Sequence, residues 1–206
     1  MTAVQFWFDP ICPWTFVTYR WLVEARAVRD LEVTPRLLSL YLLNRDRPDT
    51  GHRASHEASR ELERFLAWVR VESGDAMMEH AYHEIGFGLF GQERGDLPAL
   101  VRDVATQLGL SADDAARAAR DESWDPVIAA DHQAAMALVG DDVGSPVIAL
   151  GARGEEGAAF FGPVLTRAPH GENAGRVWDG CVALASHPDF YELKRSRGPE
   201  AQVVFD

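Results

Sequence analysis

The chain has 206 residues, 47% of them hydrophobic and 25% charged, which is the composition of a globular protein and excludes a largely disordered chain. It carries 32 acidic and 20 basic residues, for a formal net charge of −12. Nucleic acid and anionic membranes bind clustered Lys and Arg, so this charge argues against both partners. No apolar run reaches the roughly 18–20 residues of a membrane span, and the start lacks a basic signal-peptide region, so we expect a cytoplasmic protein.

A β-α-β unit is predicted at the N-terminus. Residues 4–8 form a short apolar run that stops at Asp9-Pro10, which is typical of a buried strand followed by a turn. From Pro13 to about Arg29 apolar residues recur three and four positions apart, which predicts a helix. Residues 31–40 are predicted as a second strand. A crossover of this kind joins parallel strands.

An all-helical insertion is predicted next, because residues 46–139 have helical spacing and helix punctuation throughout. The expected helices are 57–71, 76–87, 97–108, a short one opened by Ser111, and 123–139. Two hairpin strands, 146–150 and 158–161, follow around a turn at 151–157, with closing helices at 172–186 and 188–194. The fold class is therefore α/β, with one domain of residues 1–45 and 140–195, the helical insertion at 46–139, and a C-terminal tail at 196–206.

Cys12 is the candidate reactive thiol. It lies between the first strand and Pro13, a residue suited to the first helical turn, so its thiol is expected at a helix N-terminus. Unpaired backbone N–H groups and the helix dipole stabilise a thiolate there, which predicts a pKa below the usual value of about 8.5. The alternative is a small buried hydrophobic residue, as most free cysteines are. Cys181 is expected to be such a buried hydrophobic residue, because it shares an apolar helix face with Val177, Trp178, Val182 and Ala185.

Residues 7–15, with the sequence WFDPICPWT, resemble the active-site opening of DsbA-like proteins of the thioredoxin superfamily. More narrowly they resemble the actinobacterial mycothiol-dependent nitroreductases. Residues 143–148 (VGSPVI) are similar to a Gly-Thr/Ser-Pro segment of that family, and further matches lie at 160–165, 178–179 and 190–195. The resemblance implies a thioredoxin-like fold with a helical insertion, a cis-proline at Pro146 that faces the thiol, and a backbone at Ser145 that pairs with substrate.

The resemblance also implies an oxidoreductase that uses a small thiol, mycothiol in this family, as co-substrate, with no tightly bound cofactor and no metal. Its partners would be that thiol and a mixed-disulfide or small electrophilic or nitro substrate, and a homodimer is left open. The candidate substrate-binding residues are Pro13, Trp14, Ser145 and Pro146. A flat substrate could stack on Trp14, whereas Trp7 and Trp21 are expected in the core.

Thr15 stands where dithiol members of the superfamily carry a second cysteine. A protein with only the attacking thiol needs an external thiol to resolve its mixed disulfide, so a monothiol cycle is predicted, with Cys12 and Thr15 as the catalytic residues. Thr15 lies one helical turn from Cys12 and could donate its hydroxyl to the thiolate. A second departure is Phe90, near which the resemblance implies a histidine.

Two other function classes remain open. A kappa-type glutathione transferase or isomerase usually has a hydroxyl residue at the Cys12 position, and a non-catalytic thioredoxin-fold module would need no thiol there.

Other candidate sites are weaker. His52 with His56, and His80 with Glu84, lack a third metal ligand, and His80 and His83 are expected on a solvated face. The glycines of 151–157 open no helix, which argues against a nucleotide site. Exposed ion pairs on one helix are predicted for Glu57, Glu61, Glu63, Arg60 and Arg64.

Overall fold

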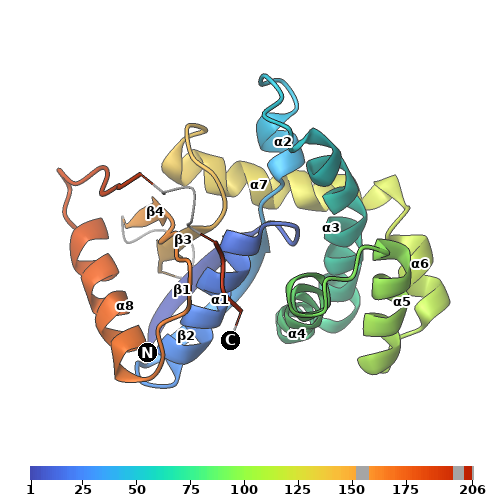
Figure 1. Cartoon of the computed structure of the whole chain (residues 1–206), viewed down its shortest axis with the longest axis horizontal. Helices are drawn as coiled ribbons and strands as arrows, with labels where there is room; N and C mark the ends of the chain where they lie inside the picture. The colour runs from blue at the N-terminus through green and yellow to red at the C-terminus, as the bar shows by residue number, and fades with distance from the viewer. Residues whose placement is uncertain (152–157, 197–201, 206) are drawn as a thin grey trace.

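The computed structural model describes residues 1–151, 158–196 and 202–205. Its sheet has four strands in the order β2-β1-β3-β4 (Figure 1). β1 (Thr2–Phe8) pairs in parallel with β2 (Leu31–Leu37), and α1 (Pro13–Arg26) is the crossover between them. β3 (Val147–Leu150) is antiparallel to β1, and β4 (Ala159–Phe161) is antiparallel to β3. The parallel pairing of the first two predicted strands is confirmed.

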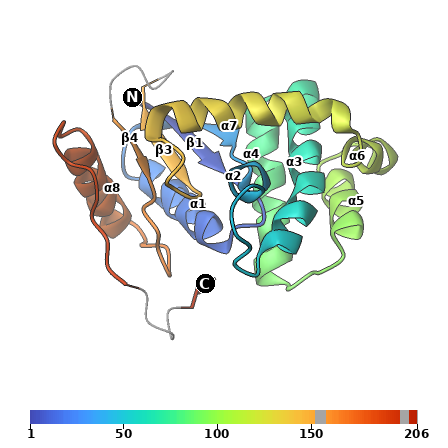
Figure 2. The same cartoon turned by 90° about the horizontal axis from the view of Figure 1, so that it is seen from above.

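The two faces of the sheet are covered by different helices. Because side chains alternate along a strand, Phe6 and Phe8 of β1 join the core cluster that includes α1 and α8 (Glu172–Ala185). Trp7 points the other way, into a smaller cluster with residues of α7 (Asp125–Val139). Figure 2 shows α7 running along the sheet and on to the helical part of the molecule. The predicted core positions of Trp7 and Trp21 are confirmed, with 1% and 0% of their surfaces exposed.

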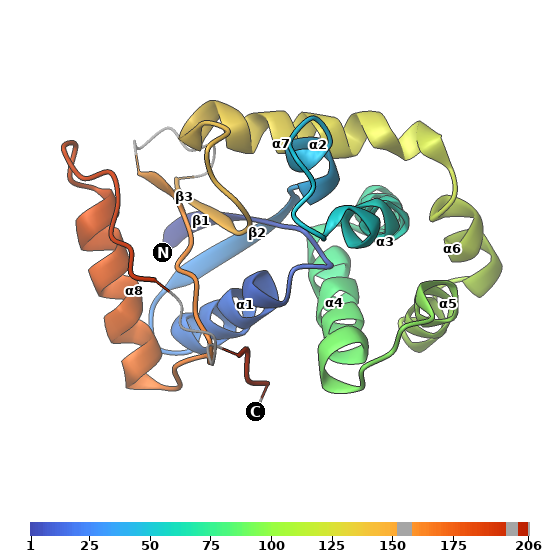
Figure 3. The same ribbon diagram turned by 45° about the horizontal axis from the view of Figure 1, so that its top comes forward.

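The helical part contains α3 (Arg53–Ser73), α4 (Asp75–Gly86), α5 (Leu97–Gln107) and α6 (Ala112–Ala118), with a π-helical turn at Phe87–Gly91 and a 3-10 turn at Glu122–Trp124 before α7. These elements confirm the helical character predicted for this stretch. α4 lies beside α1 (Figure 3). In the described part of the chain, no helix is both long and apolar enough to cross a membrane. The domain boundaries at 45/46 and 139/140 stay predictions.

Two elements differ from the sequence prediction. The second strand ends at Leu37, and α2 (Leu40–Asn44) follows, because the Ser39 side chain accepts the Leu42 N–H as a helix N-cap. The helix predicted at 188–194 is wrong: these residues form no regular element. Tyr191 and Leu193 are 93% and 80% exposed, so a short helix there would gain no packing to offset its nucleation. Residues 152–157 of the predicted hairpin turn lie outside the described residues.

Candidate active site

Cys12 is the N-cap residue of α1, immediately before its first helical residue. The turn from β1 is closed by a hydrogen bond from the Cys12 N–H to the Asp9 carbonyl, 3.1 Å long, and Pro13 opens the helix. The Cys12 carbonyl accepts the Phe16 N–H, as the first helical hydrogen bond requires. The predicted position of the thiol at a helix N-terminus is therefore confirmed.

The segment that precedes β3 lies against this turn. Antiparallel pairing places Trp7 of β1 opposite Val147 of β3, so Ser145 and Pro146 come beside the end of β1. The Ser145–Pro146 peptide bond is cis. The Cys12 Sγ lies 3.9 Å from the Ser145 carbonyl oxygen, which can accept a weak S–H hydrogen bond. Residues 133 positions apart in the chain thus form one site.

Hydroxyl groups connect the turn to Ser145. The Asp9 N–H donates to the Ser145 Oγ at 3.1 Å, and the Oγ atoms of Ser145 and Thr15 are 2.8 Å apart. If Ser145 donates its proton to Thr15, the Thr15 proton is left for the Cys12 sulfur. The side chain of Ser145 therefore hydrogen-bonds within the site. The predicted contact of Ser145 with substrate would then be made by its backbone.

Burial governs the ionisation of Cys12 in this structure. Only 9% of the residue is exposed, and desolvation raises the pKa of its thiol above the usual value. A hydrogen bond from Thr15 lowers the pKa, whereas the charge of Asp9 raises it further. The depressed pKa expected from the helix N-terminus is therefore wrong for this resting state, because the loss of hydration outweighs the donors around the sulfur.

Replacement of Thr15 by valine is expected to raise the Cys12 pKa by up to about one or two units. A hydroxyl donor to an anion contributes roughly 1.5–3 kcal/mol, and one pKa unit corresponds to about 1.4 kcal/mol. The rate of alkylation against pH measures this shift. Thr18→Val is the matched control, since the Thr18 hydroxyl of the same helix donates to backbone carbonyls of Trp14 and Pro163. An unchanged pKa in Thr15→Val would mean that the Thr15 hydroxyl serves its hydrogen bond with Ser145 and not the thiolate.

A buried pair of carboxyl groups lies behind the Cys12 turn. Asp9 is 0% and Glu63, from α3, is 1% exposed. The Asp9 carboxylate accepts the N–H groups of Ile11 at 3.0 Å and Leu40 at 2.7 Å, and the hydroxyl of Ser59. It thereby holds together the turn before Cys12, the start of α2, and α3.

Glu63 shares a hydrogen bond with Asp9. Burial, together with the charge of Asp9, raises the pKa of Glu63 well above its usual value, so the pair holds a proton that we assign to Glu63. The predicted exposure of Glu63 and Arg64 is wrong, because α3 turns both toward the interior and Arg64 is 6% exposed. Glu63 is one position after Leu62 and three before Leu66, two residues of the apolar face of the predicted helix. This closeness to the apolar face was the only sequence signal for its burial.

Replacement of Glu63 by glutamine is expected to remove a pH dependence of stability. The native state keeps the Glu63 proton at pH values where the unfolded chain has lost it, above about 4.3. Stability therefore falls as the pH rises from that value through the folded-state pKa, by up to about 1.4 kcal/mol per pH unit. Urea midpoints between pH 5 and 8 measure this slope, which should be shallower in Glu63→Gln. Glu57→Gln, on the exposed side of the same helix, should keep the parent slope.

Comparison with known proteins shows which family the chain is similar to. Residues 11–195 match the family described as Rv2466c-like, mycothiol-dependent nitroreductase Rv2466c. The chain belongs to this family. A relative from Mycobacterium tuberculosis, named uncharacterized protein Rv2286c, is 29% identical over 206 residues, which cover 97% of this chain and 84% of the relative. The family makes the protein a thiol-dependent oxidoreductase.

Solved structures show the same fold. The probable DsbA oxidoreductase SCO1869 from Streptomyces coelicolor superimposes with a TM-score of 0.60 at 19% identity, over 100% of both chains. The cytosolic disulfide reductase DsbM from Pseudomonas aeruginosa, solved with GSH, has a TM-score of 0.57 at 15% identity and covers 88% of this chain and 100% of its own. The DsbA-like, thioredoxin-type fold expected from the sequence is confirmed.

Within this Rv2466c-like chain, the remaining predicted residues take distinct places. Pro13 and Trp14 are partly exposed at the start of α1, whereas Pro146 is buried. Phe90 stacks on Phe205 at 5.3 Å between ring centroids, so aromatic packing occupies the place near which a histidine was expected. Cys181 lies on the core face of α8 as predicted, and burial raises its pKa to about 11.

A cavity of about 360 Å³ lies between α2 and the start of α3. It was not predicted from the sequence, because its walls come from a turn-rich segment with no periodic pattern. The guanidinium groups of its wall are already engaged, since Arg53 donates to the carbonyls of Arg45 and Arg47, and Arg47 donates to that of Asp141. Its lining includes Tyr41, Asn44, Arg45, Arg47, Arg53 and His56.

Proposed function

We propose that this protein runs a monothiol exchange cycle on Cys12 with a small thiol, mycothiol first among the candidates. The supporting observation is the pairing of Cys12 with Thr15 where a dithiol enzyme would have its second sulfur. The other cysteine, Cys181, packs on the core from α8. A mixed disulfide formed on Cys12 would therefore be resolved by a second molecule of small thiol.

The cycle balances in two exchanges. The Cys12 thiolate attacks the small-thiol sulfur of a mixed disulfide, the old S–S bond breaks, and the substrate leaves as a thiolate that takes a proton from water. A second small thiol, as its thiolate, attacks the Cys12 adduct, which restores the Cys12 thiolate and releases the oxidised small thiol. With a nitro compound as acceptor, two small thiols become one disulfide, and their two electrons and two protons convert the nitro group to a nitroso group and water.

The proposed substrate-binding surface is the exposed part of Pro13 and Trp14 together with the backbone at Ser145 and Pro146. The names of the relatives support a small-thiol partner, since the family is called mycothiol-dependent and DsbM was solved with GSH. DsbM is also called cytosolic, which supports a cytoplasmic location for the exchange. A homodimer stays an open expectation.

Intact-mass measurement after exposure to an oxidised small thiol tests the proposal. Oxidised mycothiol and oxidised glutathione are offered separately to the parent chain, to Cys12→Ser and to Cys181→Ser. We expect a single adduct on the parent and on Cys181→Ser, none on Cys12→Ser, and loss of the adduct when the reduced thiol is added. A parent chain that takes no adduct from either disulfide would contradict the proposal and favour the transferase or binding-module alternatives.

A further inference from the structure

Phe205 occupies an aromatic slot beside the candidate active site. Its ring stacks on that of Phe90, with 5.3 Å between ring centroids and 12° between ring planes, and lies 6.0 Å from the ring of Phe16. Phe16 and Phe90 are themselves 5.5 Å apart. A ring in this slot therefore meets two aromatic rings at once, both at distances typical of favourable aromatic pairs.

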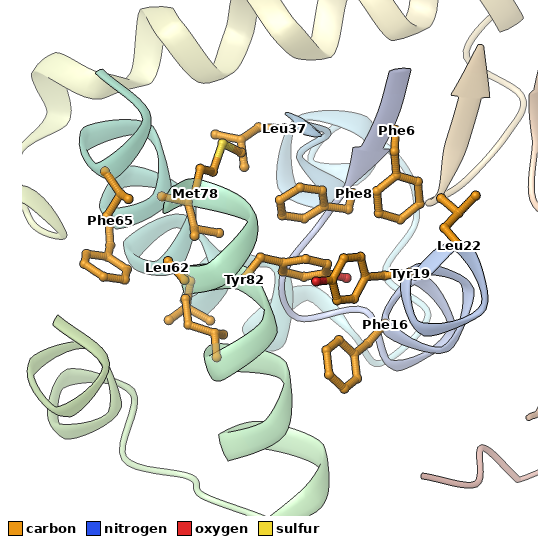
Figure 4. Close-up of a cluster of buried hydrophobic side chains, with 14 of the residues drawn as sticks. Phe6, Phe8, Phe16, Tyr19, Leu22, Leu37, Leu62, Phe65, Met78 and Tyr82 are labelled. Atoms are coloured by element: carbon orange, nitrogen blue, oxygen red, sulfur yellow. The ribbon is translucent and has the colours of Figure 1, made fainter. Parts of the chain in front are cut away.

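One wall of the slot belongs to the helix that begins at the reactive cysteine. The Phe16 N–H donates to the Cys12 carbonyl at 3.1 Å, so a ring held against Phe16 lies about one helical turn along α1 from Cys12. A Cβ atom at Gly86 of α4 would lie 2.1 Å from the Phe16 ring, so α4 packs directly on this ring and fixes it. Figure 4 shows the Phe16 ring pointing from α1 toward α4.

The other wall comes from the π-helical turn after α4. Phe90 lies within this turn, Phe87–Gly91, and the turn is followed by a hydrogen bond from the Gln92 N–H to the Phe87 carbonyl. Turns of this kind are rare and are frequently found at functional sites. The slot thus joins α1 to the helical part of the molecule.

The segment that supplies Phe205 is held by few interactions. Residues 202–205 run beside α1 (Figure 3), with Gln202 and Val204 exposed and Phe205 half-buried. Their one backbone hydrogen bond to the rest of the described chain runs from the Val204 N–H to the Thr166 carbonyl, at 2.8 Å. Exposed segments with few hydrogen bonds open at low free energy. The Phe205 ring can therefore leave the slot while the core stays folded.

We propose that the slot between Phe16 and Phe90 binds the aromatic ring of the acceptor substrate, and that Phe205 fills it until the substrate displaces it. This inference rests on the proposed function and narrows its acceptor to small planar aromatic compounds. The faces of the Phe16 and Phe90 rings are negative. A nitro group withdraws electrons from the ring that carries it, so a nitroarene stacks on these faces better than Phe205 does.

Phe205→Ala empties the slot. Equilibrium dialysis with 4-nitrobenzyl alcohol, a neutral nitroarene, measures binding in the absence of any thiol, so that no reaction takes place. We expect the dissociation constant to be about fivefold lower for Phe205→Ala than for the parent, since a competing aromatic pair is removed. Tyr191→Ala is the matched control, because it removes an aromatic side chain that is 93% exposed, and it should bind the probe like the parent.

Phe90→Leu, added to Phe205→Ala, locates the bound probe. Leucine keeps an apolar side chain but lacks the aromatic face, so the gain in affinity should be lost, and an unchanged urea midpoint would show that the double variant is folded. Equal or weaker binding by Phe205→Ala would overturn this inference, because Phe205 would then not compete for the slot. A gain that survives Phe90→Leu would overturn it as well. Neither result depends on the Cys12 adduct, whose absence from the parent would instead contradict the proposed cycle.

Discussion

Replacement of Thr15 by cysteine is expected to turn the site into a dithiol that closes on oxidation. Residues one helical turn apart meet the Cα separation of about 4.4–6.8 Å that a disulfide needs. The Thr15 side chain is fully buried beside the sulfur and hydrogen-bonds to it. Oxidised Thr15→Cys should lose the mass of two hydrogen atoms, and it should release a bound small thiol without any second thiol.

The parent chain and Thr18→Cys are the comparisons for this change. Thr18 is also buried in α1, but its hydroxyl points toward the carbonyls of Trp14 and Pro163. Both should keep their Cys12 adduct until reduced thiol is added. An adduct that persists equally on Thr15→Cys would mean that the two sulfurs cannot meet, and that the site is closed to dithiol chemistry for a reason other than the missing cysteine.

Replacement of Asp9 by alanine is expected to cost about 3 kcal/mol or more of unfolding free energy. It would leave the partly buried N–H groups of Ile11 and Leu40 and the buried Ser59 hydroxyl without their acceptor, and a fully buried unsatisfied donor costs roughly 1–3 kcal/mol. Urea unfolding at pH 7 measures this loss. Since the charge of Asp9 raises the Cys12 pKa, any folded Asp9→Ala should also show a lower pKa for the thiol.

Asp49→Ala is the control for the aspartate. The Asp49 carboxylate also accepts two backbone N–H groups, those of Gly51 and Arg53, but in an exposed turn where water can replace it. Its removal should cost far less than that of Asp9. If Asp9→Ala lost as little unfolding free energy as Asp49→Ala, the Asp9 network would be dispensable, and apolar packing would hold the three segments around it.

The sequence by itself determined the elements that rest on local chemistry. Alternating and helical spacing of apolar residues identified β1, α1 and most of the helical part, because a segment must place its apolar side chains on one face. Pro13 after Cys12 marked a helix start, since the N–H that proline lacks would have no hydrogen-bond partner within the helix at that position. The resemblance of residues 7–15 to DsbA-like proteins identified Thr15 as the residue that stands where dithiol members carry their second cysteine.

Only the tertiary structure decided how each of these residues is surrounded. Burial of Cys12 reversed the expected direction of its pKa, because desolvation depends on what covers a side chain in the folded chain and not on its neighbours in sequence. The same holds for Glu63, which a charged stretch predicted to be exposed but which is 1% exposed in the structure. Local pattern specifies which face a helix offers, and the packing of the whole chain specifies what that face meets.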